Sequence, residues 1–451
     1  MAIAILVVGG FDLLFRLGAP DWSTDEVTYK NAGWTAFHGG GMLADYETPP
    51  LAKHIIGVFE ILFGRSEVPV RISAVVAAIL TGVFLALIAR RVAGDWAALA
   101  TAAVWFALPH PGAFKLERFA LLDVFMAMFT TLGVLFAVLW GGSQKWRWVV
   151  AAGIALGLAT ACKQPGALTL VPVAIFVLAL GGFSVRSFLQ LSALTAAAVG
   201  GFVAAYIPVL DQMPDQVKYM VDFQSHQRAR GHLVLVGSHV YVHPPWWTTL
   251  LWQWDASWVL ALCYSAVIAT AVVIAARRDF NMALLLGVLV TNIGFFAFVS
   301  RNVLQHYPYA WAPVLAVIAG LAICDLARRG GLARIGALVI ALALVIPAVQ
   351  LIDRTARIRR TDYAAAAVLL RATVGTAPRV VLLGYSNVLL SYLPKSRPVG
   401  DSAVGSVDAV VLDSNVTDRL GHGWRSRYLD AHPGAFSAHK FGHLLVYLPK
   451  T

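Results

Sequence analysis

The residues of this chain that could do chemistry begin with a short polar segment after the first apolar run, Asp21-Trp22-Ser23-Thr24-Asp25-Glu26-Val27-Thr28-Tyr29. A carboxylate such as Asp25 can accept the proton of an attacking hydroxyl group. Acidic residues that follow a serine or threonine are also typical of a helix start, where they complement the helix dipole. Because carboxylates close to a bilayer are costly unless they bind or react with something, we interpret this segment as part of an active site.

A second polar segment follows as Glu47-Thr48-Pro49-Pro50-Leu51-Ala52-Lys53. Its two prolines restrict the backbone and predict a fixed turn. The ammonium group of Lys53 suits a phosphate oxygen, which accepts charge-assisted hydrogen bonds. Residues 54–64 are apolar but too short to span a bilayer, and they predict an interfacial helix.

Further basic and aromatic residues recur at the ends of later apolar runs. Lysine and arginine together with tyrosine suit a phosphate or pyrophosphate group, although each basic residue alone could equally contact a lipid headgroup. The candidate ligand-binding set is Glu26, Tyr29, Lys53, Arg118, Lys163, His226, Arg228, Arg301, His306, Tyr307 and Tyr309, with Asp25 and Asp123 as the catalytic candidates.

Composition identifies the elements that must position these residues. The chain has 451 residues, of which 59% are hydrophobic and 13% charged, and its mean hydropathy is +0.72. Soluble proteins have about 25% charged residues, so we predict an all-α polytopic membrane protein. About eleven apolar runs are candidate spans. They cover residues 1–19, 72–90, 95–112, 120–140, 148–162, 168–182, 189–210, 256–276, 281–299, 307–327 and 335–353.

The net charge of +11 is carried mainly by lysines and arginines in short loops between these runs. If the spans alternate, the loops that contain Arg90-Arg91, Lys145, Arg186, Arg277-Arg278 and Arg328-Arg329 all fall on one side. The positive-inside rule assigns that side to the cytoplasm and makes a nucleic-acid partner unnecessary. The N-terminus is then cytoplasmic, and the loops 20–71 and 211–255 and the C-terminus are extracytoplasmic.

The composition changes after Asp353. Residues 361–374 predict a helix, and the apolar runs starting at Arg379, Asp408 and His443 predict buried strands. We therefore expect two domains, a membrane domain over residues 1–353 and a small extracytoplasmic α/β domain over residues 354–451. Nothing in the second domain has the spacing of a nucleotide or metal motif, so a structural or docking role is expected.

The order of these motifs resembles a known family. The motif D-E-x-x-Y at Asp25 precedes P-P-L-x-K at Pro49, an interfacial helix that ends Phe63-Gly64, and R-x-x-x-x-D from Arg118 to Asp123. This order resembles the GT-C type glycosyltransferases that use a lipid carrier, in the branch of the protein O-mannosyltransferases and the lipid A aminoarabinose transferase. The resemblance extends over residues 1–320 or so and does not include the C-terminal domain.

This resemblance implies a GT-C fold, a polyprenyl-phosphate sugar as donor and a hydroxyl acceptor, in an integral membrane protein of the bacterial plasma membrane. It implies that Asp25 is the catalytic base, that Asp123 is a second acidic residue near the acceptor, and that Lys163 and the segment 301–309 contact the donor phosphate. The sugar would be transferred in one displacement with inversion. Thr48 stands where the family usually has histidine or lysine, so Lys53 or Lys163 would have to replace that residue.

Two questions stay open at the level of sequence. Glu47 and His243 resemble a divalent-metal pair of some members, but two ligands are an incomplete site, and the mechanism itself requires no cofactor. The acceptor could be a protein, a lipid or a cell-envelope glycan. A lipid or sugar transporter is the alternative class, but transporters bind at the membrane midplane between repeats, whereas the polar clusters here lie at one face.

Overall fold

The structure is a computed structural model. It describes residues 2–41, 45–109, 115–231, 234–236, 239–250, 258–300, 304, 306–358, 362–383, 388–400, 406–413, 429, 431–432 and 434–450. The chain divides into two compact units. The first comprises Met1–Phe15, Tyr29–Val234 and Val242–Arg357, and the second comprises Arg16–Thr28, Leu235–Tyr241 and Ile358–Thr451.

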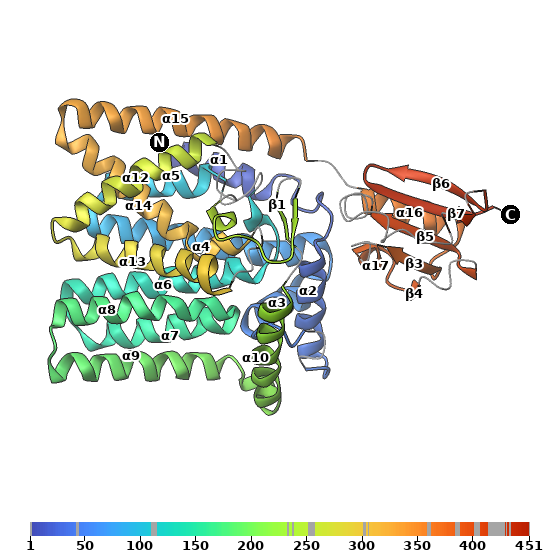
Figure 1. Cartoon of the computed structure of the whole chain (residues 1–451), viewed down its shortest axis with the longest axis horizontal. Helices are drawn as coiled ribbons and strands as arrows, with labels where there is room; N and C mark the ends of the chain where they lie inside the picture. The colour runs from blue at the N-terminus through green and yellow to red at the C-terminus, as the bar shows by residue number, and fades with distance from the viewer. Residues whose placement is uncertain are drawn as a thin grey trace. The chain divides into compact units, whose positions relative to one another are not determined.

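Most helices of the first unit run along one common direction, whereas α3 (Leu51–Phe63) and α10 (Met213–Arg230) run across it (Figure 1). The helices along the common direction are α1 (Ala2–Leu14), α4 (Glu67–Ala93), α5 (Asp95–Ala107), α6 (Leu122–Ser143), α7 (Trp146–Cys162), α8 (Leu170–Gly181), α9 (Val185–Ala204), α12 (Trp258–Ala276), α13 (Phe280–Gly294), α14 (Ala312–Arg329) and α15 (Gly331–Ala356). The crosswise α3 occupies the place predicted for an interfacial helix.

A helix lies in every range that the sequence predicted to span the membrane. Within the residues that the structure describes, seven helices are long and apolar enough to cross a bilayer, and three apolar helices are shorter, with 10–17 residues. Helix α14 ends in Asp325, Arg328 and Arg329, which interrupt its apolar run. The mainly helical membrane fold is confirmed, and the exact number of about eleven spans stays a prediction.

Helix α6 is the most enclosed of these spans, with 78% of its most apolar window buried, against 22% for α15. A helix that is apolar on all sides belongs in the interior of a bundle. The first turn of α6 carries Asp123, so the fold places this carboxylate at the end of a central helix.

Glycines allow α3 to approach α2 (Thr24–Phe37) unusually closely. A Cβ atom on Gly33 would lie 2.5 Å from the Lys53 carbonyl oxygen, and one on Gly57 would lie 2.5 Å from the Gly33 carbonyl oxygen. Since real Cβ atoms do not approach backbone that closely, only glycine fits at either position. The two backbones are therefore in direct contact beside Lys53.

The second unit is a small α/β domain. Its five-stranded sheet has the order β4-β3-β5-β7-β6, in which β3 pairs in parallel with β4 and β5, and β7 pairs antiparallel with β5 and β6. The elements are α16 (Asp362–Thr373), β3 (Arg379–Leu383), α17 (Leu389–Tyr392), β4 (Arg397–Val399), β5 (Ala409–Asp413), β6 (Phe436–Phe441) and β7 (Leu444–Pro449). Strand β5 is buried along its whole length, as expected for a central strand with an unbroken apolar run.

The remaining elements are short. They are the 3₁₀ helices η1 (Leu116–Arg118), η2 (Gln164–Thr169), η3 (Ile207–Gln212) and η5 (Tyr307–Ala310), the π-helix η4 (Phe295–Ser300), and strands β1 (Val234–Val236) and β2 (His239–Tyr241), which pair with each other. The segment 16–28, which contains Asp25, belongs to the second unit, whereas the sequence analysis assigned it to the membrane domain.

Candidate active site

Lys163 and Asp123 form the central ion pair of the first unit. The Lys163 ammonium lies 2.8 Å from both carboxylate oxygens of Asp123, and the two side chains are almost completely buried. Asp123 sits in the first turn of α6, where the helix dipole favours a negative charge. Lys163 is the residue at which α7 ends, and the extended backbone there precedes Pro165 of η2. The sequence placed both residues at the same outer end, and the structure brings them into contact.

Two residues of the 306–309 segment complete this cluster. The His306 Nε2 atom lies 3.7 Å from an Asp123 carboxylate oxygen. The Lys163 ammonium lies 4.4 Å from the centre of the Tyr307 ring, which is within the range of a cation–π contact. One ammonium group therefore lies between a carboxylate and an aromatic face, with an imidazole beside the carboxylate.

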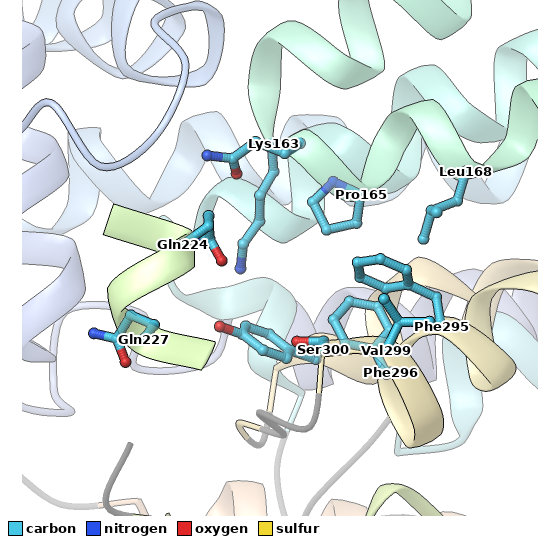
Figure 2. A pocket seen from close by; sticks show the side chains of 11 residues that line it. Lys163, Pro165, Leu168, Gln224, Gln227, Phe295, Phe296, Val299 and Ser300 are labelled. Atoms are coloured by element: carbon cyan, nitrogen blue, oxygen red, sulfur yellow. The ribbon is translucent and has the colours of Figure 1, made fainter. Parts of the chain in front are cut away.

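A cavity of about 310 Å³ opens beside Lys163. Its lining divides into a polar part and an apolar part, and Figure 2 shows Lys163, Gln224 and Gln227 away from the apolar side chains of Leu168, Phe295 and Phe296. The full lining is Lys163, Gln164, Pro165, Leu168, Gln224, Gln227, Phe295, Phe296, Val299, Ser300 and Tyr307. Four of these residues come from the π-helix η4, and π-helical turns often occur at functional sites. A cavity with one charged end and one apolar end suits an amphiphile with an anionic head.

Lys53 is a buried lysine with a different set of partners. Its ammonium donates to the Asp45 carbonyl oxygen at 2.9 Å, to the Asp45 carboxylate at 3.2 Å and to the Thr48 carbonyl oxygen at 2.6 Å. An ammonium has three donors, so these contacts use all of them. Burial lowers the pKa of Lys53 to about 8, although the Asp45 carboxylate opposes the shift. Lys53 thus fastens the 45–50 turn to α3, and its phosphate contact stays a prediction.

This turn lies next to the cavity. The Gln164 side chain donates to the Glu47 carbonyl oxygen at 2.9 Å, and Gln216 of α10 donates to the Thr48 carbonyl oxygen at 2.7 Å. Gln164 also lines the cavity beside Lys163. The predicted Pro-Pro turn is therefore held beside the Lys163 end of the cavity through its backbone carbonyl groups.

Arg118 is buried, and its guanidinium donates to the carbonyl oxygens of Asp12, at 2.7 Å, and Phe15. These carbonyl groups lie at and just after the C-terminal end of α1, where a side-chain donor can cap the helix. Burial lowers the pKa of Arg118 to about 10. The contacts make Arg118 a cap of α1, and its predicted substrate contact is untested.

The second unit holds the other acidic candidates. Ser23 and Glu26 form a capping box at the start of α2: the Ser23 N–H donates to the Glu26 carboxylate at 3.0 Å, and the Glu26 N–H donates to the Ser23 hydroxyl at 3.1 Å. Asp25 lies between them in the first helical turn. The helix-start interpretation is therefore correct for Glu26, and Asp25 as catalytic base stays a prediction. Tyr29, which follows one turn later, is buried.

The remaining candidates are dispersed. His226 of α10 and His243 are exposed, Tyr309 is fully buried, and Glu47 is exposed with its backbone bound by Gln164. Arg301 and the side chain of Arg228 lie outside the described residues. Within those residues, three or more histidine, cysteine, aspartate or glutamate side chains nowhere gather as a metal site. Glu47 and His243 therefore stay a predicted pair.

Sequence reasoning missed Gln164, Gln224, Gln227 and the phenylalanines of η4. Gln224 and Gln227 are three residues apart, which places them on one face of a helix, and this spacing was the available signal. The phenylalanines gave no signal, because they continue the apolar run of α13.

Part of this chain is similar to a known protein family. A family model described as dolichyl-phosphate-mannose-protein mannosyltransferase matches residues 47–210. The polyprenol-phosphate-mannose–protein mannosyltransferase of Mycolicibacterium smegmatis is 28% identical over 200 residues, which cover 37% of this chain and 38% of that protein. The chain thus matches well under half the length of this relative.

Solved structures match over the whole chain. ArnT from Cupriavidus metallidurans, in the apo state, has a TM-score of 0.69 at 15% identity and covers 99% of this chain and 97% of its own. The same protein bound to undecaprenyl phosphate has a TM-score of 0.68 at 16% identity, with the same coverage. The oligosaccharyltransferase AglB from Archaeoglobus fulgidus has a TM-score of 0.60 at 13% identity and covers 100% of this chain and 74% of its own. The expected resemblance is confirmed, and this chain has the fold of the GT-C type glycosyltransferases.

Proposed function

We propose that this chain is an integral-membrane glycosyltransferase that moves a sugar from a polyprenyl-phosphate carrier to a hydroxyl acceptor. The observation that carries the proposal is the Lys163 ammonium at the polar end of a cavity whose other end is apolar. The relatives support it, because one is named for a polyprenol-phosphate-mannose donor and ArnT was solved with undecaprenyl phosphate.

Lys163 supplies the charge for the carrier phosphate. Two of its three donors are used by Asp123, which leaves one for a phosphate oxygen. Tyr307 and His306 lie beside the same ammonium and carboxylate. As the bond between the anomeric carbon and the phosphate oxygen breaks, the electron pair stays on the phosphate, and the fixed ammonium stabilises it. The carrier phosphate leaves as an anion, so it needs no general acid.

On the acceptor side, the resemblance assigns the base to Asp25. The acceptor oxygen forms its bond to the anomeric carbon and gives its proton to the Asp25 carboxylate, so a single displacement inverts the configuration. Asp123 is the weaker candidate for the base, because the Lys163 ammonium contacts both of its oxygens. We assign Asp123 to the positioning of Lys163 instead.

The pattern of basic loops supports an active site at the extracytoplasmic face of a bacterial plasma membrane, with the N-terminus in the cytoplasm and the C-terminal domain outside. Cysteine substitutions labelled with a membrane-impermeant reagent test this orientation. Positions 30 and 235 should react from outside and position 145 only from the cytoplasm. The opposite pattern would contradict the proposal.

The transferred sugar is a hexose or a pentose, and the acceptor is a protein, a lipid or an envelope glycan. The mannosyltransferase relative favours a mannosyl group and a protein acceptor, although the match covers only 37% of this chain. Purified protein in membranes, incubated with radiolabelled polyprenyl-phosphate sugars, tests the activity directly. Transfer of one label to a defined acceptor would support the proposal. Retention of every label on its carrier in the presence of all three acceptor classes would contradict it.

A further inference from the structure

Asp21 precedes the candidate base by four residues and is held by the C-terminal domain. One of its carboxylate oxygens accepts a hydrogen bond of 3.0 Å from the Tyr392 hydroxyl at the end of α17. The other accepts a bond of 3.5 Å from the Tyr363 N–H in the first turn of α16. The first N–H groups of a helix have no partner within it, and a carboxylate there also complements the dipole. Asp21 therefore caps a helix more than three hundred residues away in the sequence.

Asp21 is connected to Asp25 by a short segment of backbone that side-chain contacts hold in place. Only the buried Trp22 separates Asp21 from Ser23, which forms the reciprocal capping box with Glu26. The box fixes the first turn of α2, where Asp25 lies. Only Trp22 lies between Asp21 and the capping residue Ser23. A displacement of Asp21 would therefore move the start of α2 with it.

The residues at the start of α16, which bind Asp21, are themselves held by contacts within the C-terminal domain. The Tyr363 hydroxyl donates to the Asp413 carboxylate at 3.0 Å, and both side chains are buried. His443 Nδ1 lies 2.6 Å from an Asp362 carboxylate oxygen, and His443 Nε2 lies 3.8 Å from Asp413. Burial, together with the neighbouring Asp413, raises the pKa of Tyr363, so its hydroxyl stays a donor. The contacts thus run from strand β5 through Tyr363 to Asp21.

We propose that the C-terminal domain is a positioning element of the active site, in which Tyr392 and Tyr363 hold Asp21 and thereby orient the segment that carries Asp25. This inference rests on the proposed function, in which Asp25 is the base. It gives the domain a role that its sequence, without a nucleotide or metal motif, does not indicate. Asp21, Tyr363 and Tyr392 are positioning residues, since they act on the reaction only through the segment they hold.

The hydrogen bond between Tyr392 and Asp21 can be tested without an activity assay. Tyr392→Phe removes only the hydroxyl group that bonds Asp21. Hydrogen exchange of the amides in residues 23–28 should then become about fivefold faster or more, as expected for the loss of one hydrogen bond. Tyr447→Phe is the matched control, because it removes one hydroxyl from the same domain, where Tyr447 packs against the domain's own core. Equal exchange in both variants would overturn the anchor.

Kinetics test the positioning role. A small displacement of a reacting group can cost up to about a hundredfold in rate, so kcat of Tyr392→Phe should fall roughly tenfold to a hundredfold. Affinity for polyprenyl phosphate and the unfolding temperature should match those of Tyr447→Phe. Asp21→Ala should reduce kcat at least as much, and the double variant Asp21→Ala/Tyr392→Phe should be no slower than Asp21→Ala alone, because Asp21→Ala already removes the acceptor of the Tyr392 hydroxyl.

The outcomes separate the two proposals. Additive losses in the double variant, or an unchanged kcat despite faster exchange, would overturn the positioning role. If the wild-type protein transfers no sugar, the proposed function fails, while the exchange experiment still decides whether the domain holds the segment.

Discussion

Two buried lysines of the membrane unit, Lys163 and Lys53, each contact an aspartate, but they differ in what else surrounds them. All three donors of Lys53 are used, by Asp45 and by the Thr48 carbonyl oxygen, and its side chain is 0% exposed. Lys163 uses two donors on Asp123 and lines a cavity. Burial and pairing alone therefore do not identify a functional lysine. The feature that distinguishes Lys163 as the candidate phosphate ligand is a remaining donor beside an open, partly apolar space.

The carboxylates show the same contrast. Both oxygens of Asp123 contact the Lys163 ammonium, whereas Asp25 lies in the first turn of α2. A carboxylate whose lone pairs are occupied by an ammonium is a poorer proton acceptor than one that is available to a substrate.

Asp25→Asn should reduce turnover by about 10²–10⁴-fold, the usual contribution of a general base. Asparagine is also a good residue at a helix start, so thermal stability and donor affinity should not change. Turnover at saturating donor and the unfolding temperature check both statements. Close to full activity in Asp25→Asn would exclude Asp25 as the base.

Lys53→Met should destabilise the protein by about 3–5 kcal/mol, because it leaves the buried Asp45 carboxylate without its partner. Donor affinity of the folded fraction should not change if the three protein contacts of the Lys53 ammonium exclude the phosphate contact expected from the sequence. Denaturation curves measure the loss, and the double variant Lys53→Met/Asp45→Leu should recover much of it. If Lys53→Met has normal stability but has lost donor affinity, Lys53 rather than Lys163 would be the phosphate ligand.

Lys163→Gln should weaken polyprenyl-phosphate binding by roughly tenfold to a hundredfold, since a charge-assisted contact is worth about 1.5–3 kcal/mol. Glutamine still donates a hydrogen bond to Asp123, which limits the damage to the fold. The comparison with Lys53→Gln, measured by titration of the purified proteins with polyprenyl phosphate, is the control. Equal affinities in both variants would assign Lys163 to a purely structural pair.

Asp123→Asn should reduce turnover by only about tenfold, because one oxygen can still accept from Lys163 and hold it in place. The loss should appear in donor affinity as well as in turnover. Steady-state kinetics separate the two. A fall of 10²-fold or more in turnover alone would be the result expected of a base.

The sequence predicted most of the architecture, because long apolar runs and buried strands leave a periodic signal. Helices occur in all ranges predicted to span, and β3, β5 and β7 occupy the three predicted strand regions. Strands β4 and β6 and helix α17 were missed, since β6 is mostly exposed and the other two are only three and four residues long.

The site was predictable in part. The hydropathy pattern predicted that Asp123 and Lys163 lie at the same end of the bundle of helices, as they do. Their contact could not be predicted, because it depends on tertiary packing between residues forty positions apart. The contacts of Lys53 and Arg118 could not be predicted, because most of their partners are backbone carbonyl groups, which carry no sequence signal. The same holds for Asp21, whose partners lie in the C-terminal domain.

The central claim is that the cavity beside Lys163 binds the carrier phosphate with its chain along the apolar wall. Photocrosslinking with a polyprenyl phosphate that carries a photoreactive group near its phosphate, followed by peptide mapping, tests this claim most directly. We predict adducts in residues 164–168 and 295–300, competed by unlabelled polyprenyl phosphate and reduced in Lys163→Gln but not in Lys53→Gln. Adducts confined to other helices, or unaffected by competition, would contradict it.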